Sequence, residues 1–139
     1  MTQLQKTLKV SSRPYGFVDI SAEVQEVVRE SGVREGLCVV FVQHTSASLV
    51  IQENADPSVR EDLGSWLDDL APQGRAWTHT LEGPDDMPAH AKTAVTGVSQ
   101  TIPVTDGRLA LGTWQGIYLW EHRRSRHTRR VVVHVVGES

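Results

Sequence analysis

The chain has 139 residues, of which 39 % are hydrophobic and 22 % charged, with a formal net charge of −3. These values are typical of one globular domain that buries roughly two thirds of its unfolded surface, and we propose no domain boundary within residues 1–139. The slight acidity argues against nucleic-acid binding, which needs a basic stripe across a whole face. No apolar run is long enough to span a bilayer, so we expect no membrane partner. The amino-terminal residues lack the apolar core of a signal peptide, and a single cysteine, Cys38, fits a cytoplasmic protein.

The first third of the chain predicts two strands and a helix. Residues 3–10 alternate as a strand, and residues 15–19 form a second, short one. The apolar period then changes to that of a helix that starts near Ile20 and that Gly32 would end.

The middle of the chain predicts a central strand and a second helix. Residues 37–43 form a continuous apolar run, typical of a strand covered on both faces, and residues 49–51 would be its continuation or its partner. Asp56 can cap a helix that begins at Pro57. This helix would bury one apolar stripe, consisting of Val59, Leu63, Trp66, Leu67 and Leu70.

The second half predicts a helix and a run of strands. A polar loop feeds the helix, at residues 88–96, and a Thr-Asp-Gly turn signal predicts a hairpin. The expected strands cover residues 75–81, 98–104, 108–111, 114–122 and 129–136, the last four as a meander. Together these elements predict an α+β fold: one large mixed or antiparallel sheet packed with two or three helices.

Polar chemistry is concentrated where the strand at residues 114–122 ends. Glu121 and His122 close this aromatic and β-branched strand and lead into five arginines, at positions 123, 124, 126, 129 and 130. A planar guanidinium can hold phosphate or carboxylate oxygens bidentately. The segment therefore predicts a trap for an anion, with a solvated basic hairpin tip as the alternative.

Two further polar clusters follow or precede apolar elements. His44 lies beside the hydroxyls of Thr45 and Ser46, where a histidine can act as metal ligand, general base or phosphate donor. An Asp-Asp pair ending at Asp86 precedes the third helix; such acids can bind Mg²⁺ or simply offset the helix dipole. Asp86 can also pair with His90, four residues later.

Histidines 44, 90 and 122 lie at the ends of three separate elements, a pattern expected of a composite site. Three imidazoles with an open fourth position would form a catalytic zinc arrangement. No HExxH, paired CxxC, GxGxxG or P-loop motif occurs, so no local signature identifies the chemistry. We expect the remaining histidines to be structural or solvated, namely His79, His127 and His134.

Five segments closely resemble the YjbQ-like family, whose members are often labelled secondary thiamine-phosphate synthases. They cover residues 43–49, 53–57, 82–90, 112–117 and 121–123, in the family's order and over nearly the whole chain. The resemblance implies an α+β fold with a large mixed sheet, a homotrimer, and a polar site near a subunit interface. Trp120 stands where the family more usually has a smaller residue and Ala91 where it has a bulkier one, which would reshape the substrate pocket.

Position by position, the resemblance implies one shared polar site, to which Asp56 also belongs. The expected catalytic residues are His44, Asp86, Glu121 and His122. The expected substrate-binding residues are Thr45, Ser46, Asn54, Gln115 and Arg123. A divalent metal, Mg²⁺ or Zn²⁺, would be held by His44, His90 and His122.

Three functions remain open. The resemblance implies an enzyme acting on phosphorylated small molecules, which joins a pyrimidine methyl diphosphate to a thiazole phosphate and releases pyrophosphate; arginines and a divalent metal would stabilise the leaving group. The dedicated enzyme for this reaction is a (β/α)₈ barrel of about 250 residues, so a shared activity would be convergent. The alternatives are a metal-dependent hydrolase that uses the three histidines, and a non-catalytic trimer that binds an anionic metabolite.

Overall fold

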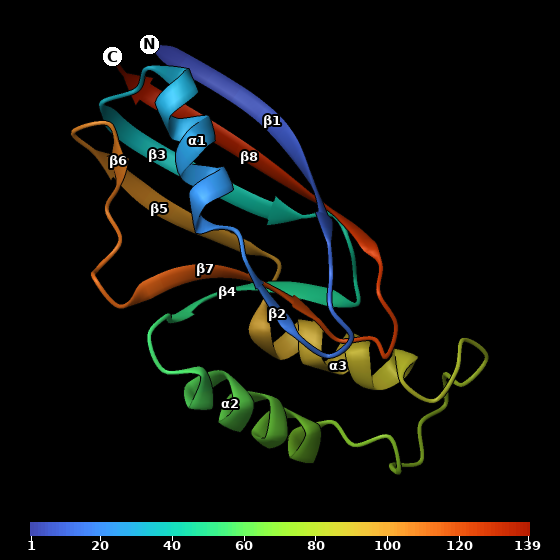
Figure 1. Cartoon of the computed structure of the whole chain (residues 1–139). Coiled ribbons are helices and arrows are strands. Elements are labelled where there is room, and N and C mark those ends of the chain that lie inside the picture. The colour runs from blue at the N-terminus through green and yellow to red at the C-terminus, as the bar shows by residue number, and fades with distance from the viewer.

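The computed structural model describes all 139 residues, and it confirms the predicted α+β class with eight strands and three helices (Figure 1). The strands are β1 (Thr2–Ser11), β2 (Phe17–Asp19), β3 (Glu35–Val42), β4 (Ala47–Glu53), β5 (Ser99–Thr105), β6 (Arg108–Leu109), β7 (Gln115–Glu121) and β8 (Thr128–Glu138). The helices are α1 (Ser21–Ser31), α2 (Pro57–Leu70) and α3 (Asp86–Thr96). None of the three helices is both long and apolar enough to cross a bilayer.

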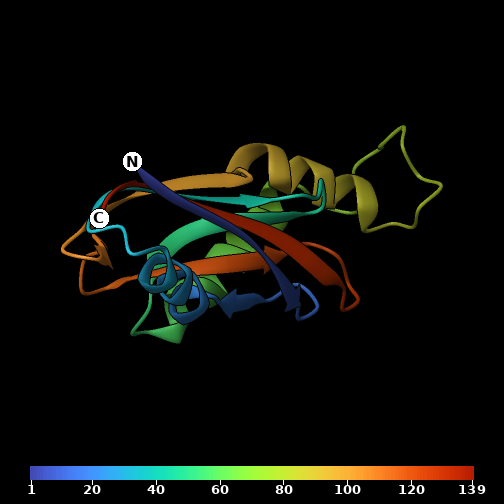
Figure 2. The ribbon, with the colours of Figure 1, turned by 90° about the horizontal axis from the view of Figure 1, so that it is seen from above.

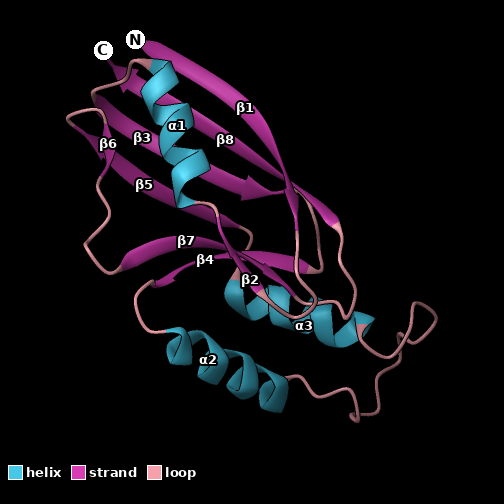
Figure 3. Ribbon diagram, viewed as in Figure 1, coloured by secondary structure: helices cyan, strands magenta, loops and turns pink.

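The strands form two antiparallel sheets (Figure 3). The large sheet has the order β1-β8-β3-β5-β6, and the small sheet has the order β2-β7-β4. In the large sheet β8 pairs with β1 on one side and with β3 on the other. Helix α1 packs against β1 and β8 and also reaches β7, so it links the large sheet to the small one.

The core lies between the two sheets and α1. Strand alternation turns one set of β8 side chains inward, at Val131, Val133 and Val135, all of them fully buried. These valines belong to one cluster with α1 and with the small-sheet residues Ile117 and Leu119. Each fully buried side chain of this size contributes roughly 1.5–3 kcal/mol to folding. This packing fixes the end of β7, where the polar residues begin.

The outer face of the large sheet is uncovered within one chain. Leu37 and Phe41 of β3 are 47 % and 42 % exposed, and their β8 neighbours Val132 and Val136 are only partly buried. The expectation that residues 37–43 are covered on both faces is therefore wrong for a single chain. Alternation places one half of the apolar run inside and leaves the other half outside.

Three expectations about strand pairing are also corrected. Residues 49–51 belong to β4, which pairs with β7 and not with β3. The last four strands form no meander, because β7 lies between β2 and β4 while β8 lies between β1 and β3. Residues 75–81 contain no strand and belong to the long loop between α2 and α3, which projects from the body in Figure 2.

The helix ends follow the local signals, whereas the buried stripe of α2 does not. Gly32 ends α1 in the left-handed conformation, with φ of 72°. Asp56 caps α2, its Oδ1 accepting from the backbone N–H of Ser58 at 2.9 Å. Of the predicted stripe only Leu67 is buried, and Trp66 and Leu70 are each 56 % exposed. Helix α2 packs against the edge strand β4, so only a narrow face of it is covered.

Candidate functional site

The first turn of α3 meets the turn between β7 and β8 through charged side chains. Arg123 donates from Nε to Oδ2 of Asp85 at 2.8 Å and from Nη1 to Oδ1 of Asp86 at 2.9 Å. Its Nη2 donates to the carbonyl oxygen of Glu82 at 3.0 Å, and the backbone N–H of Arg124 donates to Asp85 at 2.9 Å. Arg123 is therefore neutralised by carboxylates of its own chain, so it is not a free member of the predicted anion trap.

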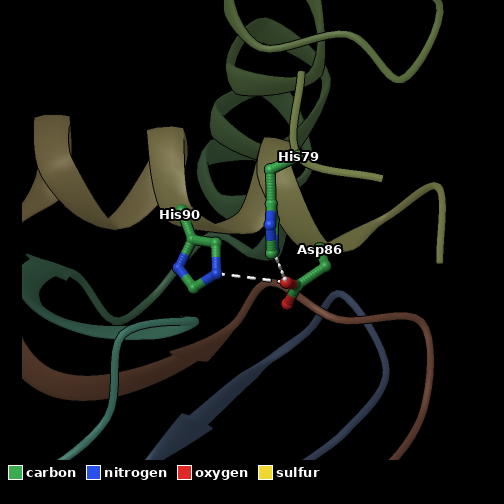
Figure 4. A group of neighbouring side chains, drawn as sticks. All are labelled: His79, Asp86 and His90. Atoms are coloured by element: carbon green, nitrogen blue, oxygen red, sulfur yellow. Dashed lines mark hydrogen bonds and ion pairs between the residues drawn. The ribbon is translucent and has the colours of Figure 1, made fainter. Parts of the chain in front are cut away.

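Asp86 is the centre of the candidate site, and two imidazoles approach the same oxygen of its carboxylate (Figure 4). Nε2 of His79 lies 2.7 Å from its Oδ2, and Nε2 of His90 lies 3.1 Å from the same oxygen. The second contact confirms the predicted pairing at four residues' spacing, because α3 begins at Asp86. Burial raises the pKa of the Asp86 carboxyl, but the hydrogen bond from His79 and the charges of His90 and Arg123 outweigh it and lower the pKa. Asp86 is thus a carboxylate at neutral pH.

The hydrogen bonds of His90 orient its ring as they would for a metal ligand. Nδ1 lies 2.9 Å from the carbonyl oxygen of Thr45, and because a carbonyl only accepts, Nδ1 carries the proton. Nε2 faces the Asp86 carboxylate, to which it donates when the ring is protonated and presents a lone pair when the ring is neutral. A cation between these atoms would relieve that contact, and a backbone carbonyl on the far nitrogen is the usual support for a metal-bound histidine.

His79, Asp86 and His90 are the single group of three or more His, Cys, Asp or Glu side chains whose ligand atoms all lie within 4.8 Å of one another. Two imidazoles and one carboxylate form a three-ligand set that suits zinc with one open position. Mg²⁺ prefers oxygen ligands and fits this set less well. The donors present therefore fit a transition metal.

The three histidines predicted as ligands do not meet within one chain. His90 lies in the Asp86 cluster, but Nε2 of His44 accepts from the backbone N–H of Arg130 at 2.9 Å. His122 is buried, with Nε2 2.8 Å from Oγ of Ser48. Burial, followed by the charge of Lys92, lowers the pKa of His122 to about 3, so its ring is neutral. The histidine that joins His90 at Asp86 is therefore His79, which the sequence predicts to be structural or solvated, and not His44 or His122.

Glu121 is completely buried and holds the neighbouring segments in position. It accepts from Oγ of Ser12 at 2.6 Å, from the backbone N–H of Arg123 at 3.1 Å, and from both Nε and Nη2 of Arg129. Nη2 of Arg129 also donates to Oγ of Ser46 at 3.0 Å. Burial raises the pKa of Glu121, and its bonds to Arg129 and Ser12 more than reverse this, so the pKa is lowered. With these four bonds Glu121 acts as a positioning residue for the polar end of β7.

Asn54 and Gln115 lie at the opposite end of the small sheet. The register of β4 and β7 pairs Ala47 with Glu121 at one end and Glu53 with Gln115 at the other. Six residues of strand separate the two ends by roughly 20 Å. The amide nitrogen of Asn54 donates to the carbonyl oxygens of Thr113 and Gln115 at 3.4 Å. The Asp86 cluster lies at the other end, where His90 contacts the main chain of Thr45. Within one chain these two predicted substrate-binding residues are therefore distant from the cluster.

Sequence reasoning placed Arg129 in the anion trap, whereas it is buried against Glu121, and it did not group His79 with Asp86. Arg129 occupies the inward position two residues before Val131, where strand alternation buries it. A buried guanidinium requires a carboxylate partner, which Glu121 supplies. His79 lies seven residues before Asp86, in the loop that precedes α3, and could have been grouped with it. Its approach depends on the path of that loop, which no local pattern describes.

Two antiparallel sheets, three helices and an Asp86-centred polar cluster define an α+β protein with a candidate metal centre at the start of α3. Residues 6–138 match the family model described as UPF0047 protein YjbQ-like. The chain belongs to this family, in agreement with the resemblance of its polar segments.

Its relatives match over nearly their whole lengths. The UPF0047 protein sll1880 of Synechocystis sp. is 52 % identical, over 98 % of this chain and 93 % of that protein. The UPF0047 protein YjbQ of Salmonella typhimurium is 44 % identical, over 96 % of this chain and 98 % of its own length. Among solved structures, a YbjQ-like protein of unknown function from Sulfolobus solfataricus has a TM-score of 0.91 at 31 % identity and covers 98 % of both chains. A YjbQ/UPF0047 family protein from Clostridium acetobutylicum has a TM-score of 0.85 at 41 % identity, over 96 % of this chain and 99 % of that one.

Proposed function

We propose that this chain is an enzyme that acts on phosphorylated small molecules and holds a divalent metal at His79, Asp86 and His90. The observation that carries the proposal is the approach of two imidazole nitrogens to one buried carboxylate oxygen. The ring of His90 is oriented for ligation by the carbonyl of Thr45. Three protein ligands with an open position are the arrangement of catalytic metal sites.

A pocket of about 360 Å³ next to the cluster offers room for the substrate. His79 lines it together with Arg75 and Trp77. The guanidinium of Arg75 stacks 4.6 Å from the ring centre of Trp77, which presents a cation beside an aromatic surface. The side chain of Arg124, 62 % exposed, is a second cation near the cluster. A planar ring beside Trp77 with phosphate oxygens on Arg75 would match this lining, and Arg124, which lies 3.9 Å from Asp85, could contribute from outside the pocket.

The named case is the reaction that the family resemblance implies, the joining of a pyrimidine methyl diphosphate to a thiazole phosphate. Pyrophosphate must leave a carbon atom, and negative charge develops on its bridging oxygen. Arg75 and Arg124 would bind the diphosphate oxygens, while Arg123 holds Asp86 in position. A bound divalent metal would supply Lewis-acid stabilisation of the same charge.

Turnover by purified protein tests this proposal. The two substrates are supplied with Mg²⁺ or Zn²⁺, and pyrophosphate release is followed together with formation of the coupled product. We expect His79→Ala and Asp86→Asn to lose at least about tenfold in turnover, because even the residues that support metal ligands typically account for about 10- to 100-fold. His134→Ala is the matched control, since His134 lies on the outer sheet face next to Gln5. Unchanged turnover in His79→Ala would remove the cluster from the reaction.

A metal-dependent phosphate-ester hydrolase is a second candidate, and the open side of the two-histidine, one-carboxylate set favours it. It differs from the first candidate in requiring only water as co-substrate. Release of inorganic phosphate from a panel of phosphate monoesters, with no coupling activity, would select the hydrolase.

We also propose that the chain works as a homotrimer in the cytosol. The partly exposed outer face of the large sheet, with Leu37, Phe41, Val132 and Val136, is an apolar patch of the kind that marks contacts between protein chains. In a closed trimer each chain would cover this patch of its neighbour with a different part of its own surface. The single buried cysteine, Cys38, supports a cytosolic setting because no disulfide within the chain can form.

A further inference from the structure

We propose that a chamber between α2 and α3, reached past Lys92, binds the oxyanion head group of a small organic anion, a phosphate or a carboxylate. This site is separate from the Asp86 cluster. His90 and Lys92 are two residues apart on α3, so their side chains leave the helix in nearly opposite directions. The inference does not depend on the metal site or on the reaction proposed above.

The space has an outer and an inner part. The outer pocket, of about 300 Å³, opens between α2 and α3 and is lined by Tyr15, Asp68, Gln73 and Lys92. Beneath it lies an inner chamber of about 30 Å³ that shares Tyr15, Asp68 and Lys92 with the pocket. One water-sized group needs about 10–15 Å³ of such space. The chamber therefore has room for one or two oxygen atoms, while the pocket has room for the body of a small molecule.

Lys92 is the fixed cation of this site. Its side chain is only 7 % exposed, whereas its ion-pair partner Asp68 is 68 % exposed on the outer side. An ammonium has three donors, and Asp68 accepts one of them. Its position is set further by the ring of Tyr15, whose centre is 5.5 Å away. An incoming oxyanion can accept the remaining donors or replace the solvent-exposed carboxylate of Asp68.

Two residues that line the chamber each carry a polar atom that lacks a partner in the chain. His122 and Trp120 both line the chamber, and both are almost fully buried. Nε2 of His122 is taken by Ser48, which leaves Nδ1 free, and the indole N–H of Trp120 makes no hydrogen bond. Both atoms keep some contact with solvent-accessible space, because Oγ1 of Thr93 is the one fully buried side-chain N or O atom without a hydrogen bond. Both atoms are therefore available to a ligand or to water.

Hydrogen-bond donors favour an anion in this space, whereas the charge of Lys92 is already matched by Asp68. Lys92 and the indole N–H of Trp120 are donors, and the neutral ring of His122 can turn an Nδ1–H toward the chamber when Ser48 donates to Nε2. Glu121 also lines the chamber, but its oxygens are occupied by Arg129, Ser12 and Arg123. Donors thus outnumber free acceptors at the floor, the composition expected of an oxyanion site.

The four tryptophan indole N–H signals in an NMR spectrum of ¹⁵N-labelled full-length protein report on the site directly. The Trp120 signal reports on the chamber and the Trp77 signal on the pocket beside His79, while the signals of Trp66 and Trp114 serve as references. Inorganic phosphate and acetate are titrated separately at constant pH. We expect a saturable shift of the Trp120 signal, and the anion that saturates at the lower concentration identifies the head group.

Two variants decide the outcome. Lys92→Met should weaken the saturable shift at least tenfold. Ser65→Ala, at an exposed position of α2, should leave the shift unchanged. The proposal is overturned if the Trp120 signal only drifts in parallel with the other three, or if its saturable shift persists in Lys92→Met. A shift confined to Trp77 would overturn it as well, while supporting the pocket beside His79.

Discussion

Replacement of Arg129 with methionine would leave the buried carboxylate of Glu121 without the guanidinium that neutralises it. Arg129 donates to both carboxylate oxygens, and the side chains of the pair are 5 % and 0 % exposed. Ser12 and the backbone N–H of Arg123 would remain as the hydrogen-bond donors of Glu121. Methionine matches the length of the arginine stem, so the change removes charge and donors with little change in packing.

The expected loss of stability is large. Removal of one partner of a buried ion pair typically destabilises a protein by about 3–5 kcal/mol, because the remaining charge stays desolvated. For a chain of this size that corresponds to a fall of about 10–20 °C in the midpoint of thermal unfolding. The outward-facing Arg126→Met is the matched control, since no hydrogen bond or ion pair holds Arg126, and it should change stability by less than about 0.5 kcal/mol.

The deficit should depend on pH in a defined direction. In the native protein the pKa of Glu121 is lowered from 4.5, so its stabilising contribution is present above the unfolded pKa and is lost as pH falls through the folded value. In Arg129→Met, burial acts against fewer favourable bonds and raises the pKa of Glu121. The folded variant then takes up a proton at a higher pH than the unfolded chain does, and its deficit shrinks as pH falls from 7 to about 5.

Urea unfolding followed by tryptophan fluorescence, at one protein concentration and at both pH values, measures this difference. The reasoning is refuted if Arg129→Met loses less than about 1 kcal/mol at pH 7. It is also refuted if the loss is the same at both pH values.

Three further results are expected. Cys38 is fully buried, and burial raises the pKa of its thiol to about 11. A thiol reagent should therefore modify it only after unfolding, and rapid modification of the native protein would contradict its buried position. Asp56→Ala removes the cap on Ser58 and should lower the free energy of unfolding by about 1 kcal/mol, whereas Asp56→Asn, which keeps an acceptor, should lower it by only a few tenths. Phe41→Glu places a charge on the outer face of the large sheet and should convert the proposed trimer to smaller species in light scattering; an unchanged mass would contradict the proposed contact surface.

Features that depend on neighbouring residues were predicted well from the sequence. The cap at Asp56, the end of α1 at Gly32 and the contact of Asp86 with His90 all follow from spacings of a few residues. Each is decided by the geometry of one helix turn. The α+β class also followed, because alternation and helical periodicity are properties of single segments.

Features that depend on distant partners were not predicted. Arg123 was expected to bind an external anion, but its partner Asp85 lies 38 residues earlier in the chain. Residues 49–51 were assigned near β3 because of their proximity in sequence, whereas β4 pairs with β7. His79 meets Asp86 only because the loop between α2 and α3 folds back onto the helix start. Sequence patterns predict which side chains point inward, but the choice of partner depends on the packing of the whole chain.

The metal content of the purified chain tests the central claim most directly. After saturation with Zn²⁺ and removal of loosely bound ions, elemental analysis should give one metal per chain for the native protein and for His44→Ala, whose Nε2 is bonded to the backbone of Arg130. His79→Ala and His90→Ala should retain well under half as much. Full zinc content in His79→Ala, or its loss in His44→Ala, would contradict a metal centre built on Asp86.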